Sequence, residues 1–250
     1  MQVPILDIDG KEIGELDLPA VFETPYRPDL IRHAVEVAAA NRTQPHGADA
    51  YAGKRTSAES MGAGFGRARI PRSNNRARRV PQAVGGRRAH PPKADTDRGK
   101  EINDRERRLA TQSAIAATSD VELVADRGHV FAEDVTMPIV LEDDFTDLTK
   151  TQDVLAALES IGIADDIERA DAGRNVRAGR GTMRGRKYKQ PTSILFVTDS
   201  ESGPSRGARN LAGANVATAR EVNVSELAPG GHPGRLTVWT ESAVAEVSER

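Results

Sequence analysis

The sequence predicts an α/β fold, with a mainly parallel sheet flanked by helices and a long extended basic loop inserted near the N-terminal third. Short apolar runs alternate with helical patterns along most of the chain, which is typical of a parallel sheet. Residues 43–100 lack any sustained hydrophobic period, and residues 60–94 hold nine bases and no acid. We therefore expect a globular domain at residues 1–42 and 101–250, and an extended loop at residues 43–100.

The N-terminal elements are predicted from turn and helix-start signals. Two short strands, at residues 3–6 and 13–18, surround the turn-forming pair Asp9-Gly10. Residues 28–40 predict a helix, because proline suits a first helical turn and the apolar side chains from Leu30 to Ala38 fall on one face.

The C-terminal part predicts alternating helices and strands. A helix over residues 103–118 begins at Asn103 with Glu106 three residues on, a capping-box-like start. A helix over 149–161 has Gly162 just past its end, where a left-handed residue commonly stops a helix. Strands are expected at 137–141, 193–198, 216–222 and 236–240, and further helices at 205–211 and 241–249.

The segment 60–94 is too polar to fold alone. Its only apolar residues larger than alanine are Met61, Phe65, Ile70, Val80 and Val84, and five glycines and four prolines interrupt it. A segment of this composition cannot bury enough apolar surface to offset the conformational entropy that it would lose on ordering. If the segment runs out and back, each arm of roughly 25 residues spans at most about 80 Å. We expect it to be disordered alone and ordered by a partner.

Charge is distributed very unevenly along the chain. The second acid-free tract, residues 172–198, carries seven bases, while the 188 residues outside the two tracts carry 19 bases and 37 acids. Basic stretches without acids are typical of surfaces that bind a polyanion, most often nucleic acid. The acidic remainder, together with 28 Arg against 7 Lys, indicates a host that lives in high salt.

Several functional classes are excluded or disfavoured. The absence of cysteine excludes disulfide scaffolds and thiol catalysis. Residues 203–207 match G-x-S-x-G, but four polar residues separate them from the preceding strand, so we interpret Ser205 as a helix N-cap. The histidines lack metal-ligand spacing. No apolar run suits a membrane span, and no leader pattern is present, so a cytoplasmic location is expected. We predict no catalytic residue, no metal site and no cofactor, apart from Mg²⁺ or monovalent ions held through RNA.

Several motifs together resemble one known family. They occupy residues 50–56, 62–64, 66–72, 85–93, 103–110, 183–188 and 228–236. These runs look like the archaeal and eukaryotic form of universal large-subunit ribosomal protein four, and the acidic composition suggests a haloarchaeal member. One departure is the run Ser73-Asn74-Asn75-Arg76, where many relatives have a Gly-rich sequence.

The resemblance implies a structural constituent of the large ribosomal subunit and not an enzyme. Members bind large-subunit (23S) rRNA early in assembly, and their extended loop penetrates several rRNA domains and helps line the polypeptide exit tunnel. The implied partners are rRNA, neighbouring ribosomal proteins and the nascent polypeptide, with no membrane and no homo-oligomer. The implied rRNA-binding residues are Lys54, Arg55, Arg67, Arg69, Arg72, Arg76, Arg78, Arg79, Arg87, Arg88, His90, Lys93, Arg184, Arg186, Lys187, Tyr188 and Lys189. The implied tunnel-proximal residues are Phe65, Gly66, Arg67, Arg69, Arg72, Ser73, Asn74, Asn75 and Arg76.

Two alternatives stay open at this point. The chain could be a non-ribosomal nucleic-acid-binding protein, which would bind any duplex with similar affinity and a steep salt dependence. It could also be an α/β hydrolase-like enzyme with a basic arm, although no catalytic constellation accompanies Ser205.

Overall fold

The computed structural model divides the chain into two units, which are described separately. One unit comprises residues 1–39 and 101–250, and the other comprises residues 40–100. The structure describes residues 1–200 and 204–248, with only the backbone described at Pro204 and Ser205.

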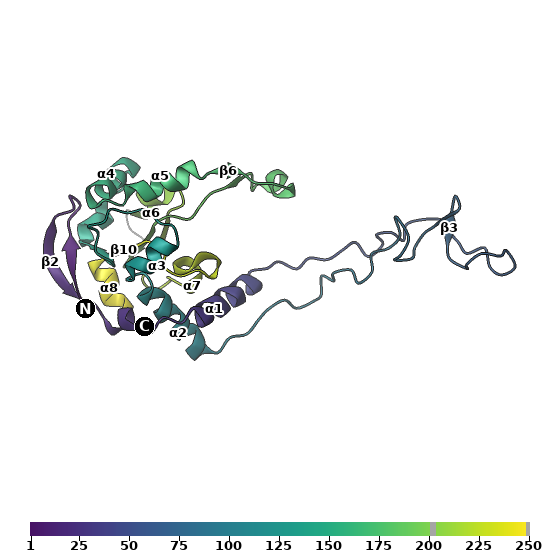
Figure 1. Ribbon diagram of the computed structural model, residues 1–250, viewed down its shortest axis with the longest axis horizontal. Helices are drawn as coiled ribbons and strands as arrows, with labels where there is room; N and C mark the ends of the chain where they lie inside the picture. Colours follow the sequence, from purple (N-terminus) through teal and green to yellow (C-terminus); the bar gives the residue numbers. More distant parts are fainter. Residues whose placement is uncertain (201–203, 249–250) are drawn as a thin grey trace. The chain divides into compact units, whose positions relative to one another are not determined.

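The first unit is built on a six-stranded sheet with the strand order β2-β1-β5-β10-β8-β9 (Figure 1). Strands β1 and β2 pair antiparallel, and every other neighbouring pair in this sheet is parallel. The strands are β1 Gln2–Leu6, β2 Glu12–Asp17, β5 Ile139–Leu141, β8 Leu195–Thr198, β9 Asn215–Thr218 and β10 Thr237–Thr240. The expected α/β fold with a mainly parallel sheet is confirmed.

Helices cover both faces of this sheet, as parallel sheets require (Figure 1). Along β5, Val140 belongs to one buried cluster while Ile139 and Leu141 belong to the other. The first cluster is completed by α1 Pro28–Asn41, α2 Asp104–Ala116, α7 Val224–Leu227 and α8 Glu241–Val247. The second is completed by α3 Val121–Asp126, α4 Thr151–Ile161, α5 Ala164–Ala172 and the 3₁₀ turn Ala208–Asn210 that follows α6 Pro204–Gly207. Alternating side chains thus hold a helix layer on each side.

Most predicted elements are present, with shifted ends. Gly162 terminates α4 with φ 83°, the left-handed conformation that its position predicts. The predicted capping box at Asn103 is wrong, because its side chain makes no capping hydrogen bond. Ser205 lies inside α6 and not before it, so it is not an N-cap; Gly203 and the predicted helix end at Glu249 lie outside the described residues. Helices α3, α5 and α7 were not predicted.

Arg235 is a buried cation at the amino ends of β8, β9 and β10. Its side chain donates to the carbonyl oxygens of Ser193 (2.7 Å), Glu226 (2.9 Å), Ile194 (3.3 Å) and Gly213 (3.3 Å), and to Oδ1 of Asn215 (2.7 Å). Burial lowers the pKa of Arg235 to about 10, which leaves the guanidinium charged near neutral pH. The side chain therefore ties the ends of β8 and β9 to α7.

We expect Arg235→Met to lower the free energy of unfolding by about 3–5 kcal/mol, because it leaves several buried carbonyl groups without donors. The measurement is denaturant unfolding of the full chain. Arg209→Met is the matched control, since Arg209 is exposed, and it should change stability by no more than about 0.5 kcal/mol. Equal effects of the two substitutions would contradict the role assigned to Arg235.

Candidate nucleic-acid interface

The unit formed by residues 40–100 has no hydrophobic core of its own. Ala58, at 1% exposure, is its only buried residue, and neither buried apolar cluster of the chain includes any residue from this unit. Phe65 and Val84 are 60% and 94% exposed. Packing within the unit therefore supplies little stability.

The two arms of this unit are joined by hydrogen bonds to backbone carbonyl groups. The amide of Ala48 donates to the carbonyl of Pro92 (2.9 Å), and Arg98 donates to the carbonyl of His46 (2.8 Å). Closer to the far end, a side chain at Gly53 would lie 2.4 Å from the carbonyl oxygen of Gly86. Glycine is needed there because the backbones approach too closely for a Cβ atom.

A short hairpin joins the two arms. Strand β3 Arg72–Ser73 pairs antiparallel with β4 Arg76–Ala77. The two turn residues, Asn74 and Asn75, have φ of 49° and 64°, which asparagine tolerates better than most residues. The asparagines therefore adopt here the left-handed backbone for which glycine is the default residue. Arg67 donates to Oδ1 of Asn75 (2.6 Å) and joins the turn to the incoming arm.

The bases of residues 60–94 are not neutralised within the protein. Most are exposed, and Arg72 and Arg78 are half-buried and donate to the carbonyls of Asn75 and Val84. Across the described part of the chain, none of the nine bases forms an ion pair. Arg55, outside the acid-free tract, does pair with Asp49, and its guanidinium lies over the ring of Tyr51. Lys54 is exposed.

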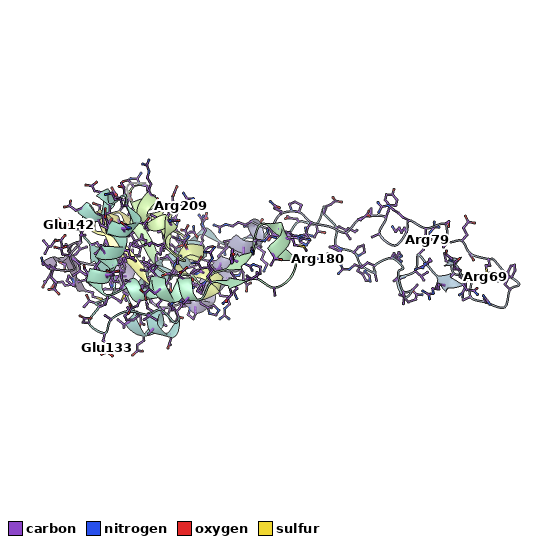
Figure 2. All side chains as sticks on the ribbon, turned by 90° about the horizontal axis from the view of Figure 1, so that it is seen from above. Arg69, Arg79, Glu133, Glu142, Arg180 and Arg209 are labelled. Atoms are coloured by element: carbon purple, nitrogen blue, oxygen red, sulfur yellow. The ribbon has the colours of Figure 1, made fainter. Side chains whose placement is uncertain are left out.

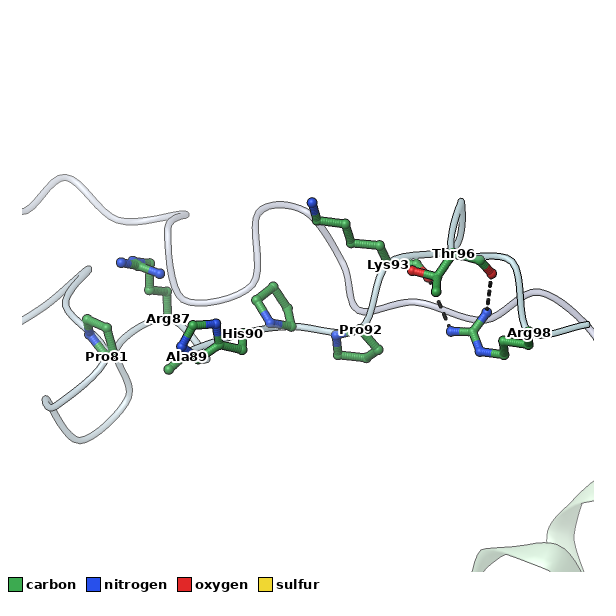
Figure 3. Close-up of a pocket in the computed structure, with 9 residues that line it drawn as sticks. Pro81, Arg87, Ala89, His90, Pro92, Lys93, Thr96 and Arg98 are labelled. Atoms are coloured by element: carbon green, nitrogen blue, oxygen red, sulfur yellow. Dashed lines mark hydrogen bonds between the residues drawn. The ribbon is translucent and has the colours of Figure 1, made fainter.

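A hollow in the returning arm brings together three of the predicted rRNA-binding residues, Arg87, His90 and Lys93 (Figure 3). Its remaining walls come from prolines, Ala89, Thr96 and Arg98. Arg98 donates to the carbonyls of Thr96 (3.3 Å) and Lys93 (3.2 Å), which fixes the turn next to the hollow. Two exposed cations and an imidazole on one short arm provide donors suited to phosphate.

The second basic tract forms a hairpin in the first unit, which the sequence did not predict. Strand β6 Asn175–Val176 pairs antiparallel with β7 Tyr188–Lys189, and a 3₁₀ turn at Arg180–Arg184 lies between them. The guanidinium of Arg174 lies 4.4 Å from the ring centre of Tyr188, and the ammonium of Lys187 lies 5.3 Å from it. All seven bases of the tract are exposed. None has an ion-pair partner among the described residues.

A buried carboxylate clamps the base of this hairpin. Asp166 accepts hydrogen bonds from His129 (3.0 Å), Arg169 (2.8 Å) and Ser193 (2.5 Å). Arg169 also donates to the carbonyl of Thr192 (2.9 Å), directly after the hairpin. Burial opposes ionisation, but the hydrogen bonds and nearby positive charge outweigh it and hold the pKa of Asp166 well below its usual range.

Acidic side chains of the first unit also lie away from this hairpin. Figure 2 shows Arg180 on the hairpin, whereas Glu133 and Glu142 lie on the helix-and-sheet body. Partial desolvation and repulsion from Asp144, Asp7 and other nearby acids raise the pKa of Glu142. Repulsion between acidic side chains this close destabilises the folded state in dilute salt, and concentrated salt screens it.

Two further features bear on the class of site. Within residues 1–200 and 204–248, no group of histidine and carboxylate side chains is arranged to hold a metal ion. The helices in these same residues are all too short or too polar to cross a bilayer.

Comparison with known proteins identifies the family. The model of the ribosomal protein L4/L1 family matches residues 16–250. The chain belongs to this family. Large ribosomal subunit protein uL4 of Halobacterium salinarum is 64% identical over 250 residues and is covered over 100% of both chains. The uL4 proteins of Haloarcula marismortui and Methanocaldococcus jannaschii are 60% and 51% identical, with 100% of this chain covered in each case and 100% and 99% of the relatives.

Family membership makes the chain a structural ribosomal protein and not an enzyme, so the hydrolase alternative is set aside. The haloarchaeal relatives, at 58–64% identity, agree with the salt-adapted composition. Sequence reasoning did not single out Arg174, Arg177 and Arg180 as site residues, although they share the hairpin with Arg184 and Arg186. Their position in the same acid-free run was the signal that could have found them.

The low pKa of Asp166 predicts a specific pH dependence. Because the folded-state pKa lies below the unfolded value of about 4, ionised Asp166 stabilises the fold above that value and loses this contribution as pH falls. We expect Asp166→Asn to lower the unfolding free energy near pH 7 by about 2–4 kcal/mol, and the deficit to shrink towards pH 2. Thermal unfolding across pH at constant salt measures it. Asp165→Asn, at an exposed neighbour, is the control, and a deficit that stayed constant with pH would contradict the assignment.

Proposed function

We propose that residues 40–100 form an extended loop that penetrates large-subunit rRNA and helps line the polypeptide exit tunnel. The observation that carries this proposal is a unit with one buried residue and nine bases that form no ion pair among the described residues. Such a unit gains its order and its counter-charge only from a partner that surrounds it. RNA phosphates supply both.

The chain is a structural constituent of the large ribosomal subunit, and its place of action is the ribosome in the cytoplasm. Its proposed mechanism is neutralisation and positioning. Exposed guanidinium groups contact phosphates, often with two donors to one phosphate, and their geometry keeps these contacts selective in concentrated salt. Ions held between protein and phosphate complete the charge balance, and we propose no cofactor.

The proposed tunnel-facing part is the far end of the loop, around Phe65 to Arg76. The turn at Asn74 and Asn75 is fixed by Arg67, and Phe65 projects with 60% of its surface exposed. A tip that carries fixed cations and one exposed aromatic ring can touch both rRNA and a nascent polypeptide. The run Ser73–Arg76, which departs from the Gly-rich sequence of many relatives, lies in this tip.

The hairpin of residues 174–189 is the proposed second rRNA contact. It is held to the first unit through Asp166 and Arg169, whereas the loop has no packed core of its own. Two basic segments, separated by about 80 residues of sequence, can bind different rRNA segments and bring them together. This supports a role as a primary binder early in assembly, with the acidic body left for solvent and neighbouring ribosomal proteins.

A free nucleic-acid-compacting protein is the competing function. It would bind duplexes of any sequence with a log–log salt slope of about −0.9 per phosphate contact. The full-length match to uL4 proteins favours the ribosomal function. Binding that survives high salt only for folded large-subunit rRNA would separate the two.

Limited proteolysis of the free protein should cut within residues 54–100 and spare the first unit. The reason is that backbone without a packed core opens locally at little cost in free energy. Mass spectrometry of the fragments identifies the cut sites. Addition of large-subunit rRNA should slow these cuts, and full resistance of the free loop would contradict the proposal.

Charge reversal of Arg87 and Arg88 to Glu should block incorporation into the large subunit, because two exposed phosphate donors become repulsive. The expected loss from the large-subunit fraction of a sucrose gradient is about tenfold or more, in magnesium and high salt.

Arg206→Glu with Arg209→Glu is the control, since both are exposed on the first unit. Circular dichroism checks that each variant folds. Normal assembly of the Arg87 and Arg88 variant would show that the rRNA contact lies elsewhere.

A further inference from the structure

The most exposed large apolar side chain of the first unit lies at the end of its basic hairpin. Met183 exposes 79% of its surface, more than any other large apolar residue that the structure describes in this unit. It belongs to the 3₁₀ turn Arg180–Arg184, which lies between β6 and β7 at the end of the projecting hairpin (Figure 1). Single exposed apolar residues are common on protein surfaces, so the surroundings of Met183 decide what it can contact.

The backbone around this turn leaves Met183 open to a partner. Gly179 and Gly185, on either side of the turn, have φ of 84° and 77°. Apart from the adjacent residues, no atom lies within 4 Å of the point that a Cβ atom would occupy at either glycine. The hydroxyl of Thr182 donates to the carbonyl of Gly179 (2.9 Å) and closes the turn. The end of the hairpin is therefore narrow, and a partner can approach Met183 closely.

The rest of the hairpin holds its apolar groups in internal contacts. Val176, 61% exposed, lies directly opposite Tyr188 in the β6–β7 pair, so the two side chains share one face. The ring of Tyr188 contacts the guanidinium of Arg174 and the ammonium of Lys187. These contacts stabilise the two strands. Met183 lies outside the strand pairing, which leaves its side chain for a contact beyond the hairpin.

The cations next to Met183 indicate the chemistry of that partner. Arg180, Arg184 and Arg186 are exposed, and they form no ion pair among the described residues. A partner that contacts both these cations and Met183 must carry negative charge beside an apolar surface. Nucleic acid has both, in its phosphates and in the faces of its bases.

Concentrated salt makes an apolar contact especially useful at this position. Salt weakens phosphate contacts steeply, because binding then gains less from the release of counterions. Burial of apolar surface is not screened by ions. The acidic composition indicates that this chain works in high salt. An apolar contact in the middle of a basic surface therefore preserves affinity where cations alone would lose it.

We propose that Met183 is an apolar anchor that packs against the face of an unstacked base of large-subunit rRNA, while the neighbouring arginines contact the phosphates beside that base. The proposal deepens the proposed function and rests on its second rRNA contact, the hairpin of residues 174–189. Within a continuous duplex, each base face is covered by the next base, so the anchor requires a bulge, a loop or a helix end. The flexible, polarisable thioether of methionine packs well against aromatic rings.

Binding of the full chain to a large-subunit rRNA transcript, measured across a range of KCl concentrations with magnesium, tests the proposal. Met183→Ala should weaken binding about fivefold to thirtyfold at every salt concentration, because the lost apolar contact is not screened. The slope of log affinity against log salt should stay as in wild type. Met183→Leu, which keeps a similar apolar volume, should bind within about threefold of wild type.

Two matched variants show whether the effect is specific. Arg184→Gln removes one phosphate contact, so it should reduce the magnitude of the salt slope by about 0.7 to 0.9. Ile13→Ala removes an apolar side chain that is 56% exposed on β2, and it should leave affinity and slope unchanged. Circular dichroism checks that each variant folds. The proposal is overturned if Met183→Ala binds like wild type, or if Ile13→Ala weakens binding equally.

The absence of cysteine from the chain allows the contacted base to be located. Val176→Cys places a single thiol on the hairpin, and an iron chelate attached to it cleaves the rRNA nearby. Permanganate for pyrimidines and diethyl pyrocarbonate for purines then report which base faces in that region are exposed. One unstacked base should be protected by wild type and by Met183→Leu, and should react when Met183→Ala is bound. Equal protection by all three proteins would contradict the anchor.

Failure of this proposal can be distinguished from failure of the proposed function. Charge reversal of Arg184 and Arg186 to Glu should weaken rRNA binding about tenfold or more. If this pair weakens binding and Met183→Ala does not, the anchor is wrong and the rRNA contact stands. If Met183→Ala lowers only incorporation into the subunit, and not affinity for rRNA, the side chain contacts a protein and the proposal is overturned. If the charge reversal also leaves binding unchanged, the hairpin is not an rRNA contact.

Discussion

Sixteen positive charges in two acid-free tracts form no ion pair within the described residues, and the rest of the structure is organised around this separation of charge. Like charges this dense cannot be buried together, so both tracts lie on chain that stays at the surface. The opposite charge is gathered on the helix-and-sheet body. A net charge of −2 conceals this separation.

The fold was largely predictable because its sheet is encoded by buried apolar runs. Residues 139–141 and 194–197 are apolar at successive positions, as strands covered on both faces must be. Helix α5 was missed because Asp165, Asp166 and Glu168 give it a polar sequence, and only the tertiary contacts of Asp166 explain a buried carboxylate there. Composition does not encode such contacts.

The candidate site, like the fold, was only partly predictable from the sequence. Charge patterning identified both basic tracts, since it depends on residue type and spacing alone. The β6–β7 hairpin was missed because Asn175 and Lys189 lack the alternating apolar pattern of a strand, and the pairing is supported by cation contacts to Tyr188. Arg235 and His129 carry no signal of their own in the sequence, because their roles come from carbonyl and carboxylate groups far away in the chain.

The close approach of Gly53 to the carbonyl of Gly86 restricts which residues fit there, and this restriction is independent of the stability of the first unit. A Cβ atom at Gly53 would push apart two arms that bury almost nothing, so the folding of the first unit would not be affected by the change. The wider loop would instead clash with the partner that surrounds it. The shape of the partner therefore decides which substitutions are tolerated at Gly53. Thermostability measurements on the isolated protein would not detect their effect.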